Sequence, residues 1–105
     1  MSEEQKLKPF EYNVTLTEAN TQYSQKLPDN TKSWTMKVRT AETVRWARST
    51  GKVAGGIAGA AVAPYLTMDG GGIPFESGIN TDETIYIASA VAGVVVEIRG
   101  YRGQF

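Results

Sequence analysis

The chain contains no histidine and no cysteine, which narrows the chemistry it can perform. Imidazole acid–base catalysis, thiolate nucleophiles, disulfides and the common zinc ligand sets each depend on one of these two residues. Eleven acidic residues remain, but the sequence sets no pair of them apart as a glycosidase would require. We therefore expect a protein that is not an enzyme and that uses no metal and no cofactor.

Two glycine-rich stretches resemble phosphate-binding loops only superficially. Thr50-Gly51-Lys52-Val53 lacks the upstream glycine and the hydroxyl residue of a Walker A motif. Gly70-Gly71-Gly72 is not followed by a helical pattern, whereas a dinucleotide-binding loop leads into a helix. Asn80-Thr81-Asp82-Glu83 carries too few alternating acids for a calcium loop. All three are interpreted as turns or loops.

Charge is separated along the chain although the net charge is zero. The segment 32–52 holds six basic residues and one acid, whereas 53–98 holds five acids and no basic residue. Such a pattern suits a partner, or a second copy, with opposite patches; equally, the charges can pair across neighbouring strands of the same fold. Trp34 and Trp46 alternate with the basic residues and are predicted in the core, so nucleic acid is not expected as a partner.

Short segments of alternating apolar and polar residues predict strands rather than helices. The most apolar of them, Thr84–Arg99, is predicted to form two strands around a tight turn at Gly93, a hairpin at the centre of one sheet. The expected strands cover 11–17, 22–27, 33–40, 43–48, 64–68 and 73–76, together with the two strands of 84–99. About eight short strands without a helix predict an all-β, single-domain antiparallel β-sandwich or jelly roll.

Two segments fall outside this strand pattern. Residues 1–10 are polar and are predicted to form an extended N-terminal arm, followed by the sandwich domain at 11–105. Residues 49–63 are rich in glycine and alanine and are predicted to form a long loop that serves as a contact surface. No apolar run approaches the roughly 18 residues of a membrane span, and the charged start lacks the apolar core of a signal peptide. We therefore expect synthesis in a cytoplasm and no membrane partner.

The series of strand and turn motifs resembles small virion proteins of tailed bacteriophages, which are encoded among the capsid genes and act as head decoration or cement subunits. The resemblance covers most of residues 12–99 and includes no catalytic signature. The motifs that carry it are Tyr23, Leu27-Pro28, Thr31-Lys32, Arg39-Thr40, Arg45, Ala47, Gly51-Lys52, Pro64-Tyr65-Leu66-Thr67, Ile85-Tyr86-Ile87-Ala88-Ser89 and Ala92-Gly93-Val94-Val95-Val96-Glu97-Ile98.

The resemblance implies a β-sandwich or jelly-roll subunit, a homotrimer, bound to the major capsid protein on the exterior of the virion capsid. Synthesis would then take place in the host cytoplasm. We expect the contacts to come from the arm, from a basic surface strip formed by Lys37, Arg39 and Arg45, and from the Gly/Ala-rich loop. The candidate contact residues are Lys8, Phe10, Lys37, Arg39, Arg45, Lys52, Ile57 and Tyr101.

Two other functions remain open from the sequence. A tail or neck component would share this fold and these charged segments. A receptor- or carbohydrate-binding module would need a platform of exposed aromatic rings, for which Tyr65, Tyr86 and Tyr101 are the candidates.

Overall fold

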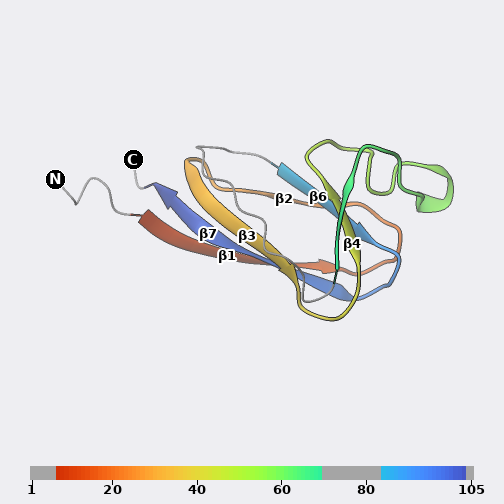
Figure 1. Cartoon of the computed structure of the whole chain (residues 1–105), viewed down its shortest axis with the longest axis horizontal. Coiled ribbons are helices and arrows are strands. Elements are labelled where there is room, and N and C mark those ends of the chain that lie inside the picture. The colour runs from red at the N-terminus through yellow and green to blue at the C-terminus, as the bar shows by residue number, and fades with distance from the viewer. Residues whose placement is uncertain (1–6, 70–83, 104–105) are drawn as a thin grey trace.

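The computed structural model describes residues 7–69 and 84–103 and folds them almost entirely into β-strands (Figure 1). A single 3-10 turn, η2 (Ile57–Gly59), is the only helical element among these residues, and none of their helices is long and apolar enough to cross a membrane. The strands are β1 (Leu7–Leu16), β2 (Tyr23–Lys26), β3 (Thr31–Val38), β4 (Val44–Ala47), β5 (Leu66–Met68), β6 (Thr84–Ser89) and β7 (Val94–Gly103).

The strands form two antiparallel sheets that pack face to face. One sheet has three strands in the order β1-β7-β3, and the other has four in the order β2-β6-β4-β5. The predicted all-β sandwich is therefore confirmed. A jelly roll has eight strands, and it is not confirmed, because seven strands are described. The strand predicted at 73–76 lies outside the described residues.

The predicted hairpin of the last third is wrong. β6 pairs with β2 and β4, whereas β7 pairs with β1 and β3, so the turn at Gly93 carries the chain from one sheet to the other. Gly93 has φ 83°, the left-handed conformation that glycine adopts without strain. The apolar faces of β6 and β7 meet across the core instead of lying side by side in one sheet.

The core contains the apolar alternate residues of both sheets. Trp34 of β3 and Trp46 of β4 meet edge to face, with ring centroids 6.2 Å apart and an interplanar angle of 88°. Edge-to-face packing is a preferred geometry of aromatic pairs because the positive ring edge meets the negative ring face. The strand phase that predicted both tryptophans in the core is therefore correct. The other buried members of the cluster are Val14, Leu16, Leu27, Met36, Val38, Val44, Met68, Ile85, Ile87, Val94, Val96 and Ile98.

Both chain ends of the described domain extend the sheet further than the sequence predicts. Leu7 to Phe10, assigned to the N-terminal arm, are the first four residues of β1 and pair with Gly103 to Gly100 of β7. Pro9 is tolerated because β1 is an edge strand. The glycines near the end of β7 do not prevent a strand there, since β1 and β3 pair with it on both sides.

The Gly/Ala-rich loop folds back onto the outer face of the four-stranded sheet. Val53 is fully buried and packs with Ala47 of β4 and Ala88 of β6 in a second, smaller apolar cluster. Tyr86 lies half-buried against the same cluster. The loop of the same chain therefore covers the outer face of β6. The start of β1 and the end of β7 lie at one end of the molecule, and η2 lies at the other (Figure 1).

The close approach at Gly100 gives a test of the extended β7. A Cβ atom at this position would overlap the Ser33 carbonyl oxygen and crowd the ring of Phe10. We expect Gly100→Ala to lower the free energy of unfolding by about 1–3 kcal/mol, the usual cost of overpacking. Urea unfolding measures this change. Arg99→Ala, at the neighbouring exposed position, should change it by less than about 0.5 kcal/mol; equal stability of Gly100→Ala and the wild type would contradict the pairing.

Candidate interaction surface

The outer face of the three-stranded sheet gathers polar and charged residues in register. β7 lies between β1 and β3, and its alternate residues point away from the core. Arg99 pairs with Glu11 of β1 and Thr35 of β3. Glu97 forms the next rung of this face, where it pairs with Asn13 and Lys37.

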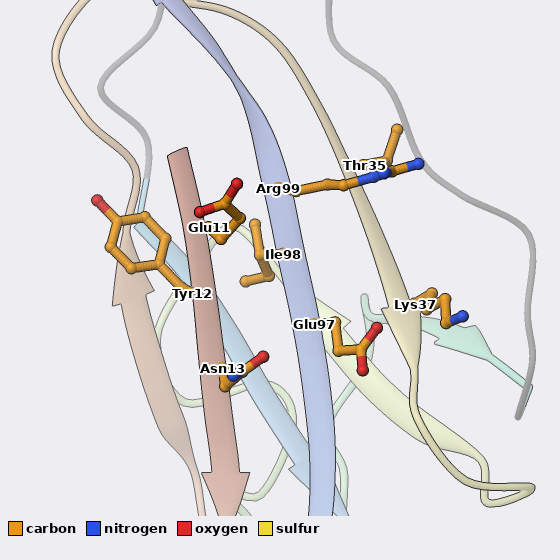
Figure 2. Close-up of a pocket in the computed structure, with 8 residues that line it drawn as sticks. All are labelled: Glu11, Tyr12, Asn13, Thr35, Lys37, Glu97, Ile98 and Arg99. Carbon is orange, nitrogen blue, oxygen red and sulfur yellow. The ribbon is translucent and has the colours of Figure 1, made fainter. Parts of the chain in front are cut away.

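Two adjoining hollows cross this face, each with a volume of about 280 Å³. They share Glu11, Thr35 and Arg99, so together they form one shallow depression, which we call the outer groove. The first hollow is shown in Figure 2 and is lined by Glu11, Tyr12, Asn13, Thr35, Lys37, Glu97, Ile98 and Arg99. The second is lined by Pro9, Phe10, Glu11, Ser33, Trp34, Thr35, Arg99, Gly100 and Tyr101.

One ion pair is made within this face. Arg39 Nε donates a hydrogen bond of 2.7 Å to Glu97 Oε2. This bond is the main reason that the pKa of Glu97 lies below its ordinary value of 4.5, although desolvation acts in the opposite direction. Charge attraction from Arg39, Lys37 and Arg99 lowers the pKa further. The basic segment and the acidic segment of the sequence therefore meet inside one subunit here, as the pairing across neighbouring strands predicts.

Other charges of the groove are directed outward. Glu11 and Arg99 are opposite each other in register and both are exposed, yet they form no ion pair within the described part of the chain. Figure 2 shows Arg99 extending across β3 at Thr35, away from Glu11. The groove thus presents cations and an anion in alternation, on a sheet whose central strand, β7, is paired on both sides.

Three of the eight predicted contact residues lie on this face: Lys37 and Arg39 on the β3 side, and Tyr101 on β7. Lys8 and Phe10 are on β1, where Lys8 is exposed and Phe10 is half-buried beside Tyr12 at a ring distance of 5.6 Å.

The predicted basic strip includes one residue, Arg45, that does not lie on the same face as the other two. Arg45 belongs to the other sheet, on β4 between β5 and β6, so it does not share a face with Lys37 and Arg39. Its side chain is half-buried and donates from Nη2 to Asn20 Oδ1 at 3.2 Å, while its Nε is buried without a hydrogen-bond partner. Arg45 thus links its sheet to the β1–β2 connection. Lys52 and Ile57 lie on the loop over the same sheet, and Ile57 is exposed.

The sequence did not predict the charged groove residues Glu11, Glu97 and Arg99 as contacts, nor Thr35, which pairs with Arg99. Period-two alternation does place Glu97, Arg99 and Tyr101 on one strand face once β7 is extended past Arg99. The pairing of this face with Glu11 and Thr35 depends on the sheet order, for which the sequence carries no local signal.

The structure separates the rings of the proposed aromatic platform. Tyr101 is on the outer face of the three-stranded sheet, whereas Tyr86 is on the outer face of the four-stranded sheet and half-buried under the loop. Since the two sheets face each other through the core, these rings point to opposite sides of the molecule. Among residues 7–69 and 84–103, no acids cluster in a way that could hold a metal ion.

No protein-family model and no curated protein sequence matches the chain. Two solved structures show a partial likeness to the chain. A chain of the crystal structure of tomato aspermy virus is 12% identical with a TM-score of 0.45, over 94% of this chain and 78% of that chain. A chain of the Bacillus endospore appendages, described as a novel family of disulfide-linked pili, is 18% identical with a TM-score of 0.41, over 92% of this chain and 89% of that chain.

The Arg39–Glu97 pair gives a pH-dependent prediction. Because the pKa of Glu97 is lower in the folded state than its ordinary value of 4.5, the pair contributes stability above that value and loses it as the pH falls through the folded-state pKa. We expect Arg39→Leu to raise the Glu97 pKa toward 4.5, and by more than Lys37→Leu does. Carboxyl chemical shifts in an NMR titration measure both pKa changes. A Glu97 pKa that does not move in Arg39→Leu would show that the hydrogen bond is absent in solution.

Proposed function

We propose that this protein is a non-enzymatic structural protein of a phage virion, a head decoration or cement subunit that binds the major capsid protein on the outer surface of the shell. The sequence resemblance to small virion proteins of tailed bacteriophages supports this proposal. The observation that carries the proposal is the outer groove, a hollowed sheet face with exposed charges of both signs. Binding a protein surface requires only such a face and no catalytic residues.

The charge pattern of the outer groove favours a protein partner over a nucleic acid. Glu11 and Glu97 alternate with Lys37, Arg39 and Arg99 across the face. A phosphate backbone is recognised by clustered cations, and carboxylates among them repel it. A protein surface can instead match alternating signs residue by residue, and such complementarity sets the orientation and specificity of binding.

The mechanism is binding alone, without a cofactor. A subunit that binds only the expanded shell stabilises that state by mass action, because each bound subunit must dissociate before the shell can relax. A homotrimer would add avidity, since three weak contacts on one rigid body act together. In this proposal the protein is made in the host cytoplasm and ends on the exterior of the capsid.

The proposal retains the N-terminal arm as a capsid contact, but the arm is shorter than the sequence predicted. Leu7 to Phe10 are part of β1, so the segment available for an additional capsid contact is residues 1–6. Lys8 remains a proposed capsid contact outside the outer groove, whereas Lys52 and Ile57, on the loop over the four-stranded sheet, remain proposed contacts with a second subunit.

Charge reversal in the outer groove tests the proposed capsid contact. We expect Arg99→Glu and Lys37→Glu each to weaken binding to undecorated, expanded phage heads about tenfold or more, because a reversed charge at a complementary interface costs well over about 1.4 kcal/mol. Co-sedimentation over a range of protein concentrations measures the binding.

Lys26→Glu is the matched control, because it makes the same charge change on β2 of the other sheet. It should bind heads like the wild type. If the two groove variants bind as tightly as Lys26→Glu does, the outer groove is not the capsid-binding face.

Deletion of residues 1–6 tests the arm without touching β1. We expect lower occupancy on expanded heads and an unchanged urea unfolding midpoint, since every residue of β1 is retained. Co-sedimentation and urea unfolding of the same preparation give the two values. Full occupancy after the deletion would remove the arm from the proposal.

A further inference from the structure

The loop end of the molecule carries an apolar strip without charge. Residues 57–66 contain no acidic or basic side chain. Ile57 is 93% exposed and Leu66 is 53% exposed, with Val62 and Tyr65 also exposed between them. Single exposed apolar residues are ordinary, but a run of them without charge marks an interaction site. We call residues 57–66 the apolar strip.

The loop that carries Ile57 is held in one conformation. The side chain of Gln22 accepts a hydrogen bond from Gly51 N at 2.8 Å and donates one to Thr50 Oγ1 at 3.0 Å. Buried Val53 fastens the next turn to the sheet. The strip itself is tied back by a hydrogen bond of 2.7 Å from Val62 N to Lys52 O. Little conformational entropy is therefore lost when Ile57 is buried by a partner.

The same region contains an apolar notch of about 200 Å³. It lies where β4 ends and β5 begins, and its lining residues are Trp46, Ala47, Arg48, Ser49, Pro64, Tyr65 and Leu66. The guanidinium of Arg48 lies 5.6 Å from the centroid of the Trp46 ring. Arg48 already interacts with the face of the Trp46 ring. It therefore keeps a favourable interaction when an uncharged side chain binds in the notch.

We infer that the apolar strip is an interface between copies of this chain, in which Ile57 of one subunit inserts into the notch of the next. An apolar cavity of about 150 Å³ holds a benzene-sized molecule, so a notch of about 200 Å³ accommodates a branched aliphatic side chain. The chain thus carries both an exposed apolar knob and a socket of suitable size. Because the strip between them has no charged residue, two copies meet there without burying an unpaired charge.

The knob and the socket are different surfaces of one subunit, so this contact is heterologous. A heterologous contact leaves a free knob on one subunit and a free socket on the other, and it closes into a ring when the rotation allows. The inference deepens the proposed homotrimer by assigning residues to its interface, and it rests on that part of the proposed function. The outer groove, on the opposite sheet, is left free for the capsid.

Light scattering coupled to size-exclusion chromatography tests the inference without any phage component. We expect the wild type to elute as an oligomer with a mass that is a multiple of 11.4 kDa. Ile57→Asp and Leu66→Asp should each elute as an 11.4 kDa monomer. Val91→Asp is the control, because Val91 is 44% exposed on the β6–β7 turn outside the strip, and this variant should keep the wild-type mass. Circular dichroism checks that every variant is folded.

A mixing experiment tests the pairing itself. The Ile57→Asp and Leu66→Lys variants, each monomeric alone, should associate when mixed, because the unaltered Ile57 of the Leu66→Lys variant can insert into the unaltered notch of the Ile57→Asp variant. A wild-type monomer, or an Ile57→Asp variant that stays oligomeric, would overturn the inference. Neither result tests capsid binding through the outer groove, which is measured separately by co-sedimentation of the groove variants.

Discussion

The two sheets of the sandwich are held together by packing across the Trp34–Trp46 contact. The two rings meet at 88°, one from each sheet, within the main cluster of buried hydrophobic residues. Because β6 and β7 are each central in their own sheet, their apolar faces close this core from both sides. Every outward-facing residue of the described sheets is positioned by this arrangement, including those of the outer groove.

The two outer faces of the sandwich have different characters. The three-stranded sheet presents a charged and partly self-neutralised face around Arg99 and Glu97. The four-stranded sheet is covered by its own loop, which leaves the apolar strip exposed at the edge. This difference is what allows one face to be proposed for the capsid and the strip for a second copy. The two functions then act on one rigid body without competing for the same surface.

Much of the fold follows from the sequence because period-two alternation reports which strand face is apolar. It placed Trp34, Trp46 and the apolar residues of β6 and β7 in the core correctly. It could not report which strands pair, since the same pattern fits a hairpin and a turn between two sheets. That limit explains the error at Gly93 and also the error at Arg45, which points outward as predicted but from the other sheet. The groove was missed for the same reason, because Glu11 and Arg99 become neighbours only through the pairing of β1 with β7.

The central claim is that the three-stranded sheet faces a capsid surface. Electron cryo-microscopy of undecorated, expanded phage heads incubated with the protein tests it most directly. We expect added density on the outside of the shell, oriented so that β1, β7 and β3 face the capsid and the loop at η2 lies away from that contact. Absence of added density, or a subunit bound through the four-stranded sheet, would contradict it.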